Sequence, residues 1–235
     1  MFPYYYDQNY FFWFILTAIP VFAHFRVNYM LRKYSKIKSF KKITGADSAE
    51  YVLEQNGVIG VDVNQIYGYF NDYYDPRIKK IFLSSGVYAN DSLAAIGVAA
   101  HEAGHAVQHD RKYKFAIFRQ KLVPATQFCS SFAFPVILMG FMLPPSCNFI
   151  MNFGILLFTI VVVFHIITLP VEYDASNRAI DTLKRSRYFS DSELACIKKI
   201  LNAAAMTYLS SLFLSFIQLL RLIFISSSRE NKNKR

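Results

Sequence analysis

Long apolar segments are the feature of this sequence that most restricts its fold. Four of them approach the roughly 20 residues that a helix needs to cross the hydrocarbon core of a bilayer. They run from Tyr10 to Phe25, from Ala125 to Pro144, from Phe149 to Leu169 and from Ala203 to Ile225. Hydrophobic residues make up 54% of the chain and charged residues only 18%, which is unlike an ordinary soluble domain. The sequence therefore predicts an integral, multi-pass membrane protein.

Two of these segments contain polar residues that need an explanation. His165 in the third segment is interpreted as a side chain satisfied by a neighbouring helix, although intramembrane histidines also occur at functional sites. Gln218 and Arg221 in the fourth segment leave three alternatives open: a span, a helix that lies along the interface, or a helix that packs inside the bundle.

Basic residues next to the first segment predict the orientation of the chain. The stretch from Arg26 to Lys42 is rich in Lys and Arg, whereas the residues before Tyr10 contain one Asp and no basic residue. By the positive-inside rule, the long loop after the first segment is then cytoplasmic. The return from Pro170 to Asn202 falls in the same compartment, so the two polar regions can meet. The basic tail does not fit four spans in this orientation.

The same distribution bears on partners. The net charge is +10, but the basic residues lie beside an apolar segment and match no nucleic-acid-binding fold. The lipid bilayer is therefore expected as a partner, and nucleic acid is not. The three cysteines are widely spaced and form no CxxC pair, which favours neither a disulfide framework nor a cysteine metal site.

These observations predict a mainly α fold, a membrane-embedded helical bundle with a small α+β cytoplasmic region. The expected regions are an N-terminal membrane anchor at 1–25, a cytoplasmic region at 26–124 with a short hairpin and a further helix, two transmembrane helices at 125–169, a cytoplasmic helix at 170–202, a fourth apolar helix at 203–225 and a basic polar tail at 226–235.

The region between the first two apolar segments has recognisable local signals. "TGADSAEYVLEQNG" predicts an amphipathic helix with Ala46, Ala49, Val52 and Leu53 on one face and Gly57 as its stop. "GVDVNQIYGYF" and "KKIFLS" predict short strands separated by the turn-rich "NDYYDPR". A hairpin of these two strands is expected ahead of the next helix.

The stretch "SLAAIGVAAHEAGHAVQHD" predicts a helix capped by Asp91 or Ser92. His101 and His105 are four residues apart, so both imidazoles lie on one face and can bind the same zinc ion. Glu102 is placed to accept a proton from a zinc-bound water. Gly104 inside this helix is explained by a close approach of another backbone or by simple tolerance. The spacing therefore predicts metal-assisted peptide hydrolysis. The small α+β cytoplasmic region at 26–124 is thus expected to be a zincin-like catalytic region, and the cytoplasmic helix at 170–202 is expected to carry the third metal ligand.

A third ligand has to come from elsewhere in the chain. His109 lies about 12 Å along the helix axis from His101, too far for the same ion on a continuous helix. In "LPVEYDASNRAIDTL", Glu172 shares a stripe with Ala175, Ser176 and Ala179, whose small side chains permit close helix packing. Glu172 is therefore the preferred third ligand and Asp174 the reserve. An equally weighted alternative is that both acids only favour a helix start.

Taken together, "VAAHEAGHAVQH", "YDPR" and "LPVEYDASNRA" resemble the YugP-like neutral zinc metallopeptidases of bacterial membranes, over nearly the whole chain. The resemblance implies a membrane-embedded zinc peptidase of a bacterial inner membrane, with His101 and His105 as ligands and Glu102 as the catalytic carboxylate. The wider similarity is to gluzincins such as the HtpX-like and CAAX prenyl endopeptidases, whose third ligand is the glutamate of an ExxAD pattern.

Glu172 matches the glutamate of that pattern, whereas Ser176 stands where the pattern has aspartate. The resemblance thus implies Glu172 as the third ligand but leaves the second-shell partner unassigned, with Asp174 or Asn177 as substitutes. Zn²⁺ is the expected metal, because two imidazoles, one carboxylate and an open position suit it.

The function predicted is zinc-dependent hydrolysis of peptide bonds in membrane-associated or juxtamembrane protein substrates at the cytoplasmic face. The alternative is a noncatalytic membrane scaffold or chaperone-like binding protein that keeps a structural zinc. Structural zinc sites usually have four protein ligands, and such a site leaves Glu102 without a role, so the enzyme is favoured. Substrate identity, the oxyanion-stabilising residue and oligomeric state have no signal in the sequence.

Overall fold

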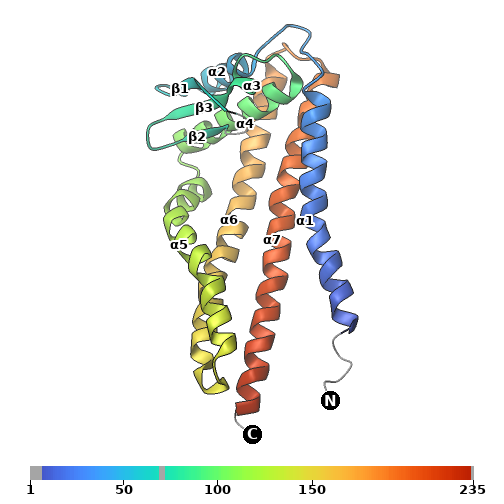
Figure 1. Ribbon diagram of the computed structural model, residues 1–235. Coiled ribbons are helices and arrows are strands. Elements are labelled where there is room, and N and C mark those ends of the chain that lie inside the picture. Colours follow the sequence, from blue (N-terminus) through green and yellow to red (C-terminus); the bar gives the residue numbers. More distant parts are fainter. Residues whose placement is uncertain (1–6, 69–71, 234–235) are drawn as a thin grey trace. The chain divides into compact units, whose positions relative to one another are not determined.

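The computed structural model describes residues 7–68 and 72–233, and side chains within these ranges from residue 18 to residue 230. The fold is mainly helical with one small sheet, as predicted (Figure 1). The chain forms two compact units, one of Met1–Pro20, Phe118–Leu169 and Tyr208–Arg235, the other of Val21–Ile117 and Pro170–Thr207. Four long helices have residues in both units: α1 (Asp7–Tyr34), α5 (Lys114–Met142), α6 (Asn148–Arg185) and α7 (Asp191–Asn233).

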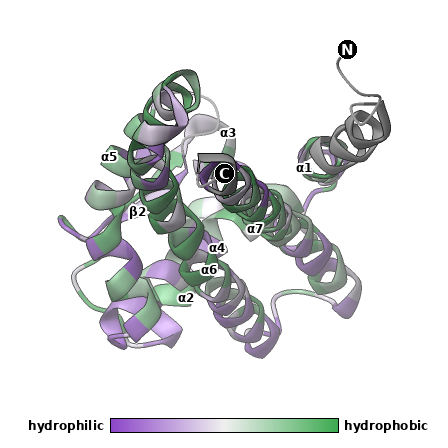
Figure 2. Cartoon of the chain, turned by 90° about the horizontal axis from the view of Figure 1, so that it is seen from below, coloured by the Kyte–Doolittle hydropathy of each residue, from purple (hydrophilic) through white to green (hydrophobic). Residues whose placement is uncertain are grey.

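The first unit holds the most apolar parts of the chain. Within the described residues, three helical stretches are long and apolar enough to cross a membrane, Lys114–Met142, Pro145–Arg185 and Asp191–Glu230. Large apolar side chains on them are exposed, among them Phe134, Phe149 and Phe224, and Figure 2 shows hydrophobic residues along much of α5 and α7. Outward-facing apolar residues on long helices are what a bilayer requires. The predicted first span, Tyr10 to Phe25, lies within α1, and its side chains before residue 18 lie outside the described part.

Several polar side chains inside the first unit make hydrogen bonds between its helices. Nδ1 of His165 lies 3.0 Å from the Ser215 hydroxyl on α7, which matches the interpretation of a histidine satisfied by its neighbour. Helix α7 continues to Asn233 through most of the predicted polar tail. Arg229 on this extension donates to the carbonyl oxygens of Gly140, Phe141 and Leu143 at the end of α5. Its guanidinium therefore caps carbonyl groups that the helix itself leaves unsatisfied.

Two capped helices form the centre of the second unit. Helix α2 (Gly45–Gln55) begins with a capping box between Thr44 and Asp47, and it buries Ala46, Ala49, Val52 and Leu53 as predicted. Helix α4 (Leu93–Asp110) is capped by Ser92, whose hydroxyl accepts from the Ala95 amide. The buried faces of α2, α4, α6 and α7 meet in one hydrophobic cluster, so α4 lies inside the core of this unit.

The sheet lies against the same cluster through Ile81 and Leu83. Its strands are β1 (Asp62–Ile66), β2 (Tyr73–Asp75) and β3 (Lys80–Ser84), in the order β1-β3-β2. The short helix α3 (Ser85–Tyr88) follows β3 directly. The two predicted strands both form, but they pair in parallel, so the predicted hairpin between them is wrong. The segment expected to be only a turn supplies β2, which pairs antiparallel with β3 and makes the hairpin instead.

Helices α4 and α6 touch at Gly104. A Cβ atom at this position would lie 2.4 Å from the carbonyl oxygen of Ala175 on α6, far inside van der Waals contact. Ala175 and Ala179 are fully buried, and Ser176 is 6% exposed. The small residues therefore permit the close helix packing that the sequence predicted, and close approach explains the glycine.

We expect Gly104→Ala to destabilise the protein more than Gly97→Ala on the same helix. Overpacking against backbone costs about 1–3 kcal/mol, partly offset by the helix preference of Ala over Gly, about 1 kcal/mol. At Gly97 the nearest atom to the added Cβ is a side-chain methyl carbon of Ile197, at 3.3 Å, which can move. Thermal unfolding of both variants in detergent measures the difference, and equal melting temperatures would contradict the steric role of Gly104.

Candidate metal centre

Three predicted ligands come together in the second unit. His101 and His105 lie one turn apart on α4, with ring centroids 4.7 Å apart. Glu172, on α6 and 2% exposed, places its Oε2 3.2 Å from Nε2 of His101 and 3.7 Å from Nε2 of His105. One ligand atom from each residue lies within 4.8 Å of the others. Among the described residues this is the one such group of three His, Cys, Asp or Glu side chains.

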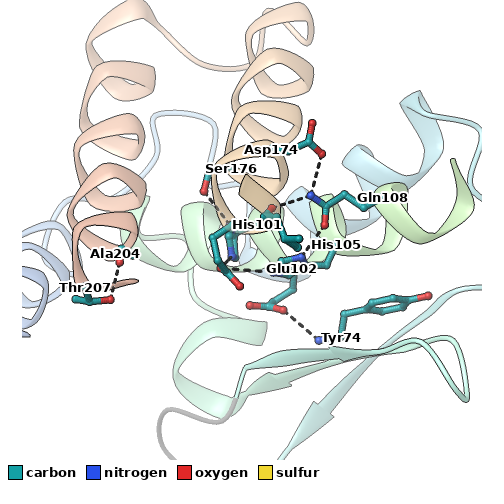
Figure 3. Close-up of polar contacts among 11 residues, drawn as sticks. Tyr74, His101, Glu102, His105, Gln108, Asp174, Ser176, Ala204 and Thr207 are labelled. Atoms are coloured by element: carbon teal, nitrogen blue, oxygen red, sulfur yellow. Dashed lines mark hydrogen bonds and ion pairs between the residues drawn. The ribbon is translucent and has the colours of Figure 1, made fainter. Parts of the chain in front are cut away.

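In each histidine, the ring nitrogen Nδ1, on the side away from Glu172, contacts a polar side chain. Nδ1 of His101 lies 3.0 Å from the hydroxyl of Ser176 on α6. Nδ1 of His105 lies 3.0 Å from Oε1 of Gln108 on α4. Figure 3 shows both contacts on the side of the rings away from Glu102. Such partners fix ring orientation and commonly contribute 10–100-fold to metal affinity.

Gln108 also determines where the proton of His105 sits. Its amide nitrogen donates to the Val171 carbonyl at 2.7 Å and to Asp174 Oδ2 at 2.8 Å. Both amide protons are therefore used, so the oxygen of Gln108 faces His105 and accepts from it. His105 must then carry hydrogen on Nδ1, so Nε2, the nitrogen that faces Glu172, is the one that could bind a metal ion.

This donor set fits a divalent cation. A buried carboxylate and two imidazole nitrogens converge on one point, and such a group requires positive charge among its members. Burial by itself raises the pKa of Glu172, but hydrogen bonding to His101 and His105 outweighs burial and holds the pKa well below its ordinary value. Two nitrogens and one carboxylate oxygen are the ligands of many catalytic zinc sites. His101, His105 and Glu172 would hold the ion.

Glu102 lies beside these three residues, outside the ligand group. Its Oε2 accepts from the backbone amide of Tyr74 on β2 at 3.0 Å, as Figure 3 shows. Burial raises the pKa of Glu102 to about 7, the charge of His101 opposes the rise, and the negative charges of Glu172 and Asp72 add to it. A carboxylate with a pKa near neutrality is suited to exchange protons with a reacting group.

The other predicted residues lie elsewhere. The His109 ring is 5.7 Å from the Tyr74 ring and is not in the ligand group. Asp174 accepts from Gln108 and from Nε of Arg178 at 2.6 Å, so it acts on the site through Gln108. Asn177 is exposed. The partner role considered for Asp174 is thus indirect, and His101 is contacted by Ser176 itself.

Sequence reasoning missed Ser176, Gln108 and the Tyr74 amide as parts of the site. The signal for Ser176 was present, since it occupies the aspartate position of the ExxAD pattern and its hydroxyl can accept the same hydrogen bond. The "YDPR" motif contains Tyr74, and its Asp75 pairs with Arg77 at 2.7 Å in the turn after β2. Nothing in the sequence pointed to Gln108, because an amide inside a helix has no distinctive spacing.

Ser176→Ala is expected to weaken zinc binding about 10-fold, because His101 loses the partner that fixes its ring. The adjacent exposed Asn177 provides the control, and Asn177→Ala should bind zinc like the wild type. Competition with a chromophoric chelator measures both affinities. Equal affinities for the two variants would show that Ser176 does not support the ligand.

Glu172→Gln is expected to lower the zinc content from about one ion per chain towards zero, because the neutral amide cannot balance the ion. Elemental analysis of detergent-purified protein with a folding check measures this. Asp174→Asn is the comparison, since it keeps an oxygen acceptor for Gln108 and should retain zinc. Loss of zinc in Asp174→Asn with retention in Glu172→Gln would move the third ligand to Asp174.

Comparisons with known proteins agree with this geometry. Residues 9–227 match the model of the family described as "Putative neutral zinc metallopeptidase". The chain is also 38% identical over 216 residues to "Putative membrane protease YugP" of Bacillus subtilis (strain 168), covering 92% of this chain and 95% of that protein. No solved structure matches the chain. Zinc is therefore the metal expected at the three-residue site, and the chain belongs to this family of neutral zinc metallopeptidases.

Proposed function

We propose that this protein is a zinc-dependent endopeptidase that hydrolyses peptide bonds in membrane-associated or juxtamembrane segments of other proteins. The observation that carries the proposal is the pairing of a three-residue ligand group with a separate carboxylate. His101, His105 and Glu172 converge, while Glu102 is held beside them by a backbone amide. Three protein ligands leave a coordination position for a reactant, which is typical of catalytic zinc sites.

The residues divide the chemistry between them. When bound, zinc supplies Lewis acidity, which polarises the substrate carbonyl and lowers the pKa of water. Glu102 takes up the proton of the attacking water on its carboxylate and returns it to the leaving amine. The Tyr74 amide keeps one carboxylate oxygen in place during both transfers. Ser176 and Gln108 contact Nδ1 of the two imidazoles, so Nε2 of each ring would be the nitrogen that binds the ion.

Membrane-associated substrates are proposed because the site and the apolar helices share one chain. Helix α6 carries both a candidate span and Glu172. The relative from Bacillus subtilis has a name that describes a membrane protease. The basic stretch from Arg26 to Lys42 supports a cytoplasmic site at a bacterial inner membrane. A zincin-like catalytic region, with α4 between the sheet and α6, belongs to the same proposal.

The alternative function, a scaffold or chaperone-like protein with a structural zinc, would require a different number of protein ligands at the site. Such sites are usually closed by four protein ligands, whereas the described residues bring three together. A structural site also has no need of a fixed carboxylate that does not bind the ion. The two functions are separated by whether Glu102 is required for peptide cleavage.

Glu102→Gln should retain zinc and lose at least about 100-fold in the rate of peptide cleavage, the usual contribution of a general base. The assay uses zinc-loaded protein in detergent with unfolded membrane-protein fragments, and mass spectrometry detects the products. Glu50→Gln, at an exposed carboxylate on α2, is the matched control and should cleave normally. Cleavage that persists in Glu102→Gln would contradict the mechanism, and a wild type that cuts nothing would contradict the function.

A further inference from the structure

The metal-binding face of α4 extends beyond the metal site. From Ser92 to Gln108 nearly every residue of this helix is buried, and the partly exposed ones are Val98, His101, Glu102 and His105. Their spacing places them along one stripe of the helix. Val98 lies one turn before His101, about 4.5 Å along the axis. The accessible stripe therefore continues from the ligands towards the start of α4.

A cavity of about 550 Å³ opens at that end of the stripe. Its floor is the α4 surface of Ala94, Ala95 and Val98, and Leu31 and Arg32 of α1 line another wall. Ala94 and Ala95 are 6% and 2% exposed, so small side chains form the bottom. Pockets of about 300–1,000 Å³ enclose small organic ligands. The cavity is thus large enough for a bulky side chain together with adjoining backbone.

The cavity and the catalytic carboxylate share a short segment of chain. Asp72 lines the cavity and accepts from the Ser84 amide at 2.6 Å. Tyr74, two residues later, donates its amide to Glu102. Two residues of extended chain span at most about 7 Å. The cavity therefore adjoins the reacting centre on two sides, through the α4 stripe and through the start of β2.

We propose that this cavity receives a bulky, uncharged side chain of the substrate close to the scissile bond. The proposal rests on the zinc peptidase function and names its specificity pocket. The apolar floor favours burial of an apolar side chain, which contributes about 1.5–3 kcal/mol when complete. The lining carries one cation, Arg32, and one anion, Asp72, so it offers no net charge to select a basic or acidic side chain.

The position of the cavity also bears on where the substrate segment lies. Its α1 wall begins at Asn28, three residues after the predicted end of the first span at Phe25. Three residues of helix correspond to about 4.5 Å. A peptide in the cavity would then lie just outside the bilayer, which suits the juxtamembrane segment of a membrane protein.

Binding of peptide hydroxamates tests the pocket without requiring turnover. These compounds bind zinc through the hydroxamate, and one series varies a single neighbouring side chain among Trp, Leu, Ala, Lys and Glu. The zinc-loaded wild type should bind the Trp or Leu compound at least 10-fold more tightly than the Ala, Lys and Glu compounds. In Ala94→Leu, which fills the floor, the preference over Ala should fall to near unity while the zinc content stays unchanged.

The matched control is Ala89→Leu, at an exposed position outside the cavity, and it should keep the wild-type preference. Val98→Phe also fills the cavity, from a partly exposed position. If Ala94→Leu fails to fold, the same binding comparison is made with Val98→Phe. The proposal is overturned by equal binding of the Leu and Ala compounds, by preference for Lys or Glu, by an unchanged preference in the filled variants, or by no binding at all. Selective binding without peptide cleavage would support the pocket and contradict the proposed peptidase function.

Discussion

The contact between Gly104 and the backbone of Ala175 is the constraint on which the candidate metal site depends. Without a Cβ atom at position 104, α6 can approach α4 until a carbonyl oxygen occupies the space of the missing methyl group. That approach brings Glu172 from 71 residues away in sequence to hydrogen-bonding distance of His101. A wider helix separation would leave two histidines on one helix and an isolated buried carboxylate on another. The absence of a side chain at Gly104 thus lets the two helices approach closely enough for the polar contacts of the site to form.

Polar contacts then convert a cluster of side chains into a defined donor set. Ser176 belongs to the same helix as Glu172, so one face of α6 contacts His101 twice, once at each ring nitrogen. His105 is held by Gln108, and Asp174 with Arg178 fixes Gln108 in turn. The amide nitrogen of Gln108 donates to two oxygens, so its amide oxygen must accept the hydrogen bond from His105. Nδ1 of His105 therefore carries a hydrogen. Buried networks with every group satisfied favour a single arrangement.

Local sequence patterns predicted the helices, whose side chains recur with a regular spacing. They did not predict the sheet, because its structure depends on pairing between distant segments. The α4 helix, its cap at Ser92 and the face shared by His101 and His105 follow from spacing. Glu172 was reachable because small residues flank it on one stripe. The strand β2 was not predictable in this way. Asp72 and Asp75 before Pro76 have strong turn preferences, which outweigh the strand preference of Tyr73 and Tyr74. Parallel pairing of β1 with β3 depends on β2 occupying the other edge of β3, which no local pattern encodes.

Helix α6 runs without a break from Asn148 to Arg185 and contains Pro170, the first residue of the second unit's share of this helix. Proline removes a backbone hydrogen bond, so it is the point at which a long helix bends most readily. Glu172 lies two residues beyond it. The point at which α6 bends most readily therefore lies within one helical turn of the candidate metal site. A change in this bend would move the Glu172 carboxylate relative to His101 and His105 on α4.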